Sequence, residues 1–146
     1  TALAQGIGEK LSQLPPMVKC PVLIAKPSVS VSTKFVYQNL KLDENTNHPD
    51  IDALISAIKK KNFPEICTKM GNVLESVTIP NYPVIAEIKE KMMEAGAAHA
   101  MMSGSGPTVF GLFEDEETAQ RARDVMKASG LARQVYLTSI YNNRRK

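Results

Sequence analysis

The sequence predicts an α+β domain in which an antiparallel sheet carries helices on one face. Three observations support this fold class. A short apolar run, residues 22–25, lies between Pro21 and Pro27, as is typical of a buried strand. Apolar residues recur at helical spacing over residues 49–61. Two further apolar runs, residues 98–102 and 108–113, are separated only by small residues, which indicates two strands joined by a loop.

The first part of the chain predicts a hairpin and a short helix around that first strand. Residues 3–11 form the hairpin, because Gly6 and Gly8 can turn the chain back on itself. After the strand, a helix can start at Ser32 or Thr33, where a hydroxyl group serves as the N-cap. The N-terminus of this helix is expected to face the segment that follows the strand.

Three further helices are predicted between that short helix and the next strand. Residues 49–61 are amphipathic, with acidic side chains in the first turn and lysines in the last, which suits the helix dipole. A shorter helix is expected over residues 64–70. The third covers residues 83–95 and is closed by Gly96, which can adopt the positive φ of a C-terminal cap.

A last helix and a last strand complete the predicted order. The helix starts near Asp115 and ends before Gly130, and residues 134–140 form the closing strand. Its apolar face is expected to bury Ala119, Ala122, Val125 and Met126. The order strand, helices, strand, strand, helix, strand is that of a ferredoxin-like split β-α-β sandwich.

Composition excludes two classes of partner. No stretch approaches the ~18 consecutive apolar residues of a membrane-spanning helix, so no membrane is expected. The net charge of +3 is accounted for by Arg144, Arg145 and Lys146. With 5% aromatic residues and no tryptophan, the chain lacks the basic stripe with stacking rings that nucleic acid needs.

The cysteines and histidines predict neither a disulfide nor a metal site. Cys20 and Cys67 are far apart in sequence and are expected to be small buried hydrophobic residues, which fits a reducing, cytoplasmic location. His48 and His99 have no partners at metal-ligand spacing. His99 lies in an apolar run, so a hydrogen-bonded histidine in the core or at its rim is expected there.

The loop between the two later strands, Ser103-Gly104-Ser105-Gly106-Pro107-Thr108, is suited to an anion. Gly104 and Gly106 can adopt positive φ, so successive N–H groups can converge on a phosphate while the hydroxyl groups lie beside them. Such strings more often form a simple turn. The loop matches neither the P-loop nor the dinucleotide-binding glycine pattern.

Four segments together resemble the GHMP kinases. They are Gly6-Ile7-Gly8-Glu9-Lys10-Leu11, Ala25-Lys26-Pro27-Ser28-Val29-Ser30-Val31-Ser32-Thr33, Gly71-Asn72-Val73-Leu74-Glu75 and Met102-Ser103-Gly104-Ser105-Gly106-Pro107-Thr108-Val109-Phe110. The last is similar to the family's C-terminal glycine-rich motif. The resemblance covers essentially all 146 residues, and the order of the segments is that of a member that acts in non-mevalonate isoprenoid biosynthesis.

The resemblance implies a kinase of which this chain is the C-terminal half. The family's ATP-binding glycine loop and its catalytic Asp and Lys belong to an N-terminal domain, and no stretch here matches them. We therefore expect a truncated or proteolysed product that is inactive alone. Residues 1–20 would be a hairpin left from the domain junction, and residues 21–146 the C-terminal domain. The full enzyme would use ATP and Mg²⁺, and the exposed cleft face could self-associate.

The resemblance also assigns binding residues, but no catalytic residue and no metal ligand. Ser103, Gly104, Ser105, Gly106, Pro107 and Thr108 would approach the substrate and support the phosphate loop. Pro27, Ser28, Val29, Ser30 and Thr33 would form a wall beside the small-molecule substrate. Lys26 could meet a phosphate, although a solvated strand end is an equal alternative.

A second interpretation comes from another class of protein. Ferredoxin-like domains also serve as non-catalytic small-molecule-binding or regulatory modules, and a fold does not fix a function. The absence of a recognisable catalytic set in the sequence keeps this alternative open. Such a module would bind its effector without any further domain.

Overall fold

The computed structural model describes residues 1–142, so Arg144, Arg145 and Lys146, which account for the net charge, lie outside the described residues. The chain opens with the predicted hairpin, in which β1 (Ala2–Gln5) pairs antiparallel with β2 (Lys10–Gln13) as a separate two-stranded sheet. Within the described residues, no helix is long and apolar enough to cross a membrane.

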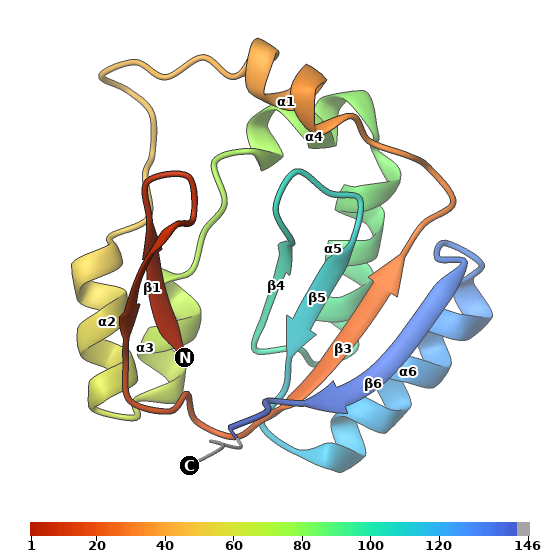
Figure 1. Cartoon of the computed structure of the whole chain (residues 1–146). Helices are drawn as coiled ribbons and strands as arrows, with labels where there is room; N and C mark the ends of the chain where they lie inside the picture. The colour runs from red at the N-terminus through yellow and green to blue at the C-terminus, as the bar shows by residue number, and fades with distance from the viewer. Residues whose placement is uncertain (143–146) are drawn as a thin grey trace.

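The main sheet has four antiparallel strands: β3 (Pro21–Lys26), β4 (His99–Met102), β5 (Val109–Leu112) and β6 (Gln134–Ser139). Their spatial order is β4-β5-β3-β6, so β3 lies between β5 and β6, both of which come later in the chain. This arrangement confirms the ferredoxin-like prediction (Figure 1).

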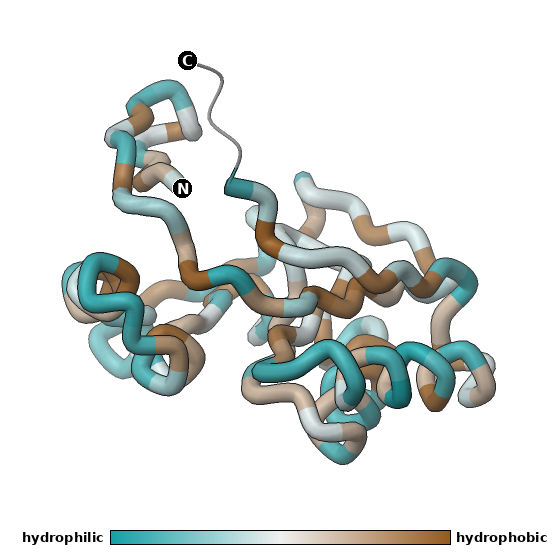
Figure 2. Tube along the Cα trace, turned by 90° about the horizontal axis from the view of Figure 1, so that it is seen from below, coloured by the Kyte–Doolittle hydropathy of each residue, from teal (hydrophilic) through white to brown (hydrophobic). Residues whose placement is uncertain are grey.

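Helices α5 (Val84–Glu94) and α6 (Glu116–Ser129) cover one face of this sheet. Figure 2, which views the sheet nearly edge-on, shows helices packed along one side of it. Between the layers lies a core of fully buried side chains that includes Leu23, Ile85 and Phe113. Each such side chain contributes roughly 1.5–3 kcal/mol by leaving water, so this layer stabilises the domain.

One residue that the sequence predicts to be buried is exposed in the structure. Val125 on α6 is 44% exposed, whereas Ala119, Ala122 and Met126 are buried as expected. Successive helical residues are about 100° apart, so Val125 lies roughly a quarter turn away from the centre of this buried stripe. A narrow stripe of two alanines and one methionine is sufficient to seat α6 on β3 and β6.

Helices α2 (Ile51–Lys59) and α3 (Phe63–Lys69) begin at side-chain caps, since Asp50 accepts a hydrogen bond from the Ala53 amide and Asn62 accepts one from the Glu65 amide. They pack as a pair beside the opposite face of the sheet. Cys20 and Cys67 are buried there, as predicted. Burial, with Cys67 nearby, raises the pKa of the Cys20 thiol to about 11.

The short helices α1 (Thr33–Asn39) and α4 (Glu75–Asn81) lie together at one end of the sheet, at the top of Figure 1. Ser32 caps α1, as predicted, by accepting a hydrogen bond from the Phe35 amide. The sequence did not predict α4. Its residues 77–80 are three β-branched residues and a proline, which have low helix propensity, so tertiary packing stabilises this helix.

Candidate functional site

The loop between β4 and β5 adopts the backbone conformation that its glycines allow. Gly104 has φ +56° and Gly106 has φ +87°. The Ser103 amide donates to the Thr108 carbonyl (2.8 Å), and the Gly106 amide donates to the Ser103 carbonyl (3.0 Å). These two N–H groups therefore close the loop and are not free for a ligand.

Three other amides of the loop remain available. Within residues 1–142, the N–H groups of Gly104, Ser105 and Thr108 donate to no protein acceptor, and Pro107 has no N–H. The predicted cradle is therefore smaller than the sequence suggested. Main-chain N–H groups freed at a turn with positive φ are suited to an anion.

The loop is held in place by two side chains that the sequence did not predict as site residues. The Asn72 side-chain amide donates to the carbonyls of Met102 (2.9 Å) and Gly104 (2.8 Å). The hydroxyl of Thr78, which is fully buried, donates to the Ser105 carbonyl (3.0 Å). These bonds occupy the carbonyl of Met102 at the end of β4 and the carbonyls of Gly104 and Ser105 in the loop, so the loop is fixed against the protein.

An ion pair supports the same strand end. The Glu75 carboxylate accepts from the Lys89 ammonium group (2.7 Å) and from the Met102 amide (3.3 Å). Both side chains are partly buried, so this pair is shielded from water more than a surface pair. Residues 71–75, one of the four segments that resemble the GHMP kinases, thus position the loop.

Helix α1 brings a second predicted set of residues to the loop. The hydroxyl groups of Thr33 and Ser105 share a hydrogen bond of 2.9 Å. Thr33 is the first residue of α1, so the bond joins the start of that helix to the middle of the loop. This is the one direct link between the two sets of predicted site residues among the hydrogen bonds of residues 1–142.

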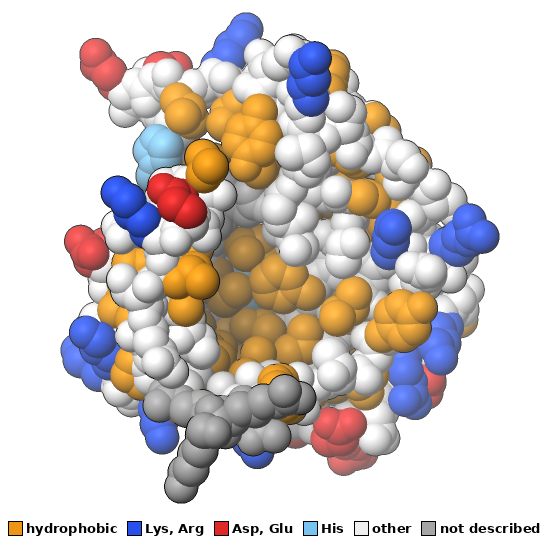
Figure 3. Space-filling model, in the orientation of Figure 1, with side chains coloured by type: hydrophobic (Ala, Val, Ile, Leu, Met, Phe, Trp, Pro, Cys, Tyr) orange, Lys and Arg blue, Asp and Glu red, His pale blue; other side chains and the backbone are white. Residues whose placement is uncertain are grey.

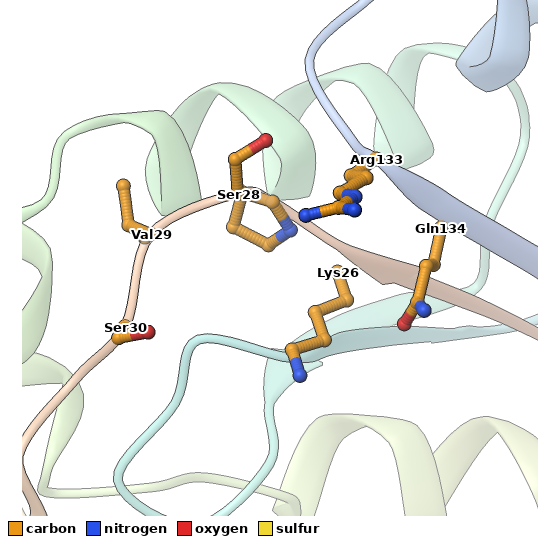
Figure 4. A pocket seen from close by; sticks show the side chains of 7 residues that line it. Lys26, Ser28, Val29, Ser30, Arg133 and Gln134 are labelled. Atoms are coloured by element: carbon orange, nitrogen blue, oxygen red, sulfur yellow. The ribbon is translucent and has the colours of Figure 1, made fainter.

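The remaining predicted wall residues line a different pocket. Pro27, Ser28, Val29 and Ser30 surround a cavity of about 160 Å³ at the end of β3, together with Lys26, Arg133 and Gln134. Figure 4 shows Ser28, Val29 and Ser30 following one another along the chain that leaves β3, with Arg133 and Gln134 coming from the start of β6. No residue of the 103–108 loop lines this cavity.

The face of the sheet opposite α5 and α6 is apolar. A pocket of about 240 Å³ lies between the sheet and helices α2 and α3, and hydrophobic side chains cover the hollow in Figure 3. Its lining residues are Met17, Val22, Leu54, Ile58, Ile66, Met70, Phe110, Leu112 and Ile140.

His99 differs from its prediction. The sequence suggested a hydrogen-bonded histidine, but its Nε2 atom is buried and has no partner within residues 1–142. Burial, and to a smaller extent the charge of Lys89, lowers the pKa of His99. The β-strand fixes the direction of the His99 side chain, and no described residue places a polar atom within hydrogen-bond distance of Nε2.

The site presents groups that are suited to an anion. The loop has hydroxyl and N–H donors, and the carboxylate beside it, Glu75, is already paired. Within the described residues, no cluster of acidic, histidine or cysteine side chains could hold a metal ion. Asn72, Thr78 and Arg133 were not predicted as site residues. Asn72 lies in one of the segments that resemble the GHMP kinases, whereas Thr78 and Arg133 lie in none of them.

Comparison with known proteins gives a consistent result. The family model described as "GHMP kinases C terminal" matches residues 54–131. Two curated proteins named 4-diphosphocytidyl-2-C-methyl-D-erythritol kinase are similar. That of Lachnospira eligens is 57% identical over 97% of this chain and 49% of its own length. That of Bacillus subtilis is 47% identical over 93% of this chain and 46% of its own.

Solved structures agree. A crystal structure of 4-(cytidine 5'-diphospho)-2C-methyl-D-erythritol kinase has TM-score 0.79 and 25% identity, covering 97% of this chain and 50% of that one. Homoserine kinase from Cytophaga hutchinsonii has TM-score 0.75 at 22% identity, over 94% of this chain and 46% of that one, and shows the shared fold. The chain spans about half the length of the relatives it matches. It belongs to the GHMP kinase family, and the part of that family it represents is the C-terminal domain.

Proposed function

We propose that this chain is the C-terminal, substrate-binding half of a 4-diphosphocytidyl-2-C-methyl-D-erythritol kinase. The whole enzyme transfers the γ-phosphoryl group of ATP, with Mg²⁺, to the 2-hydroxyl of that substrate in isoprenoid biosynthesis. The names of the similar proteins support the substrate, and their length supports a second half that carries the ATP loop and the catalytic Asp and Lys.

The observation that carries this proposal is the loop of residues 103–108. Phosphoryl transfer depends mainly on positioning and on stabilising negative charge. The free amides of Gly104, Ser105 and Thr108 provide such stabilisation, and the bonds from Asn72 and Thr78 fix them in place before a ligand arrives. In this proposal the loop orients a phosphate across a cleft whose other wall is the N-terminal half.

The substrate wall is proposed in two parts. Thr33 contributes a hydroxyl beside the loop, near the reacting end of the substrate. Pro27, Ser28, Val29 and Ser30 contribute the wall of the neighbouring pocket, near the diphosphocytidyl group. None of these side chains removes or supplies a proton, so their role is to bind and orient.

We also propose the division of the chain into two parts. Residues 1–20, which include the separate β1–β2 sheet, form the junction to the other half, and residues 21–146 form the C-terminal domain. The Asn142 side chain donates to the Met17 carbonyl (2.8 Å), and this bond fastens the junction to the domain.

A chimera tests the function. The 146-residue chain is fused behind the N-terminal half of the Lachnospira eligens relative, and ADP release is measured with 4-diphosphocytidyl-2-C-methyl-D-erythritol. The chimera is expected to be active and the chain alone inactive. A folded chimera without activity, together with tight binding of a small molecule by the chain alone, would favour the non-catalytic module instead.

A matched pair of variants tests the site within the chimera. Ser105→Ala removes the hydroxyl that meets Thr33 and is expected to lower kcat/KM by about tenfold, since a hydrogen bond in a substrate site is worth about 1 kcal/mol or more. Ser76→Ala removes an exposed hydroxyl of α4 that bonds only within its own turn, and kcat/KM should not change. Equal losses in both variants contradict the assignment.

A further inference from the structure

The pocket at the end of β3 adds Arg133 and Gln134 to the residues that the sequence predicted there. Two of its seven lining residues, Lys26 and Arg133, are cationic, and none is acidic. Ser28, Ser30 and Gln134 add hydroxyl and amide donors. A small cavity with two positive charges and several donors is complementary to a compact, highly charged anion.

Neither cation forms an ion pair with a residue that the structure describes. Within residues 1–142, the ion pairs are Lys89–Glu75, Arg121–Glu117 and Arg123–Asp124, so Lys26 and Arg133 have no carboxylate partner. Both side chains are exposed. Two like charges on one cavity repel each other, and an anion between them removes that repulsion.

The backbone holds the two cations in a fixed relation. Lys26 is paired with Gln134 at the end of the β3–β6 ladder, and the Arg133 amide donates to the Lys26 carbonyl (2.9 Å). Pro27 is buried and turns the chain away from the sheet directly afterwards. Figure 4 shows the Arg133 guanidinium group extending toward the chain at Ser28, whereas the Lys26 and Gln134 side chains extend in the other direction, away from it.

We propose that this pocket is a diphosphate-binding subsite, in which the Arg133 guanidinium and the Lys26 ammonium group each bind one phosphate. The planar guanidinium group can donate two parallel hydrogen bonds to phosphate oxygens, and Lys26 adds a point charge. The hydroxyl groups of Ser28 and Ser30 complete the donors. That the diphosphate is the one carried by the kinase substrate rests on the proposed function, whereas the anion subsite itself does not.

Binding of inorganic pyrophosphate by the 146-residue chain tests the subsite directly. Calorimetry gives Kd, and the amide NMR signals of Ser28, Val29 and Gln134 report where the anion binds. Arg133→Met and Lys26→Met are each expected to weaken binding by about tenfold or more, since a hydrogen bond to a charged group is lost. Arg133→Lys keeps the positive charge but loses the paired N–H donors of the guanidinium group, so its Kd should lie between that of the unchanged chain and that of Arg133→Met.

The control is Arg121→Met, which removes the same charge from the exposed face of α6. Its Kd should equal that of the unchanged chain, because a general charge effect is screened in 0.15 M salt. The subsite is overturned if pyrophosphate does not bind, if the shifted signals lie elsewhere, or if Arg121→Met weakens binding as much as Arg133→Met does.

The chimera then identifies the source of the diphosphate. If the substrate carries it, Arg133→Met raises KM by about tenfold and leaves kcat nearly unchanged, since the group is remote from the reacting hydroxyl. If Arg133→Met loses pyrophosphate binding but leaves KM unchanged, the subsite binds a free diphosphate anion and not the substrate. A chimera that is inactive in every form, with pyrophosphate binding as expected, refutes the proposed function and leaves the subsite standing.

Discussion

The loop geometry predicts that two neighbouring glycines respond very differently to the same substitution. A Cβ at Gly106 would lie 2.8 Å from the Sδ atom of Met102 and 3.3 Å from the Cγ2 atom of Thr78. Both neighbours are fully buried and cannot move aside cheaply. A Cβ at Gly104 would meet no atom within 4 Å. Both glycines have positive φ, so the backbone strain of an alanine is common to the two sites.

The expected magnitudes follow from these contacts. Gly104→Ala costs only the positive-φ strain, about 1 kcal/mol of the free energy of unfolding. Gly106→Ala adds overpacking of about 2 kcal/mol, for a total of about 3 kcal/mol. For a chain of this length, Tm should fall by about 3 °C for Gly104→Ala and about 9 °C for Gly106→Ala.

Thermal and urea unfolding of the 146-residue chain measure both variants. The two curves should have the same urea dependence, because the surface exposed on unfolding does not change. The same loss of Tm in the two variants would show that the buried contacts around Gly106 do not hold the loop. A larger loss for Gly104→Ala would refute the described loop conformation altogether.

Two further predictions concern side chains near the site. Asn72→Ala removes three hydrogen bonds and should lower the free energy of unfolding in urea by about 2 kcal/mol. Asn39→Ala, which loses one exposed hydrogen bond, should lower it by less than about 0.5 kcal/mol. Similar losses in the two variants would contradict the role of Asn72. The lowered pKa of His99 means that the unfolded chain takes up this proton first as pH falls. The free energy of unfolding should therefore decrease as the pH falls below about 6.5. His99→Gln should reduce this decrease, whereas His48→Gln, at an exposed position, should leave it unchanged. The same decrease in His99→Gln as in the unchanged chain would contradict this prediction.

Local signals explain why most elements could be predicted. The hairpin, the prolines around β3 and the hydroxyl cap of α1 each act through neighbours in sequence, and the structure confirms them. The order of these elements was sufficient to predict the ferredoxin-like fold. Helix α4 was missed because its own residues disfavour a helix, and packing against α1 and α5 overrides that preference.

The candidate site was predicted only in part. The glycine loop could be recognised because positive φ needs particular residues at particular places. The number of free amides in the loop could not be predicted from the sequence, since it depends on hydrogen bonds formed within the folded loop. His99 was placed correctly in an apolar strand, yet the lack of a partner for its Nε2 atom depends on neighbours from other elements.

The sequence by itself determined the order of most strands and helices and the position of the glycine loop between β4 and β5. Tertiary structure alone decided which groups of that loop remain free, because Asn72 and Thr78 bond to it from 32 and 27 residues away along the chain. It also decided that Arg133 lies beside Lys26. The physical reason is that caps, turns and periodicity act over a few residues, whereas hydrogen bonds and charges act through space between strands that only folding brings together.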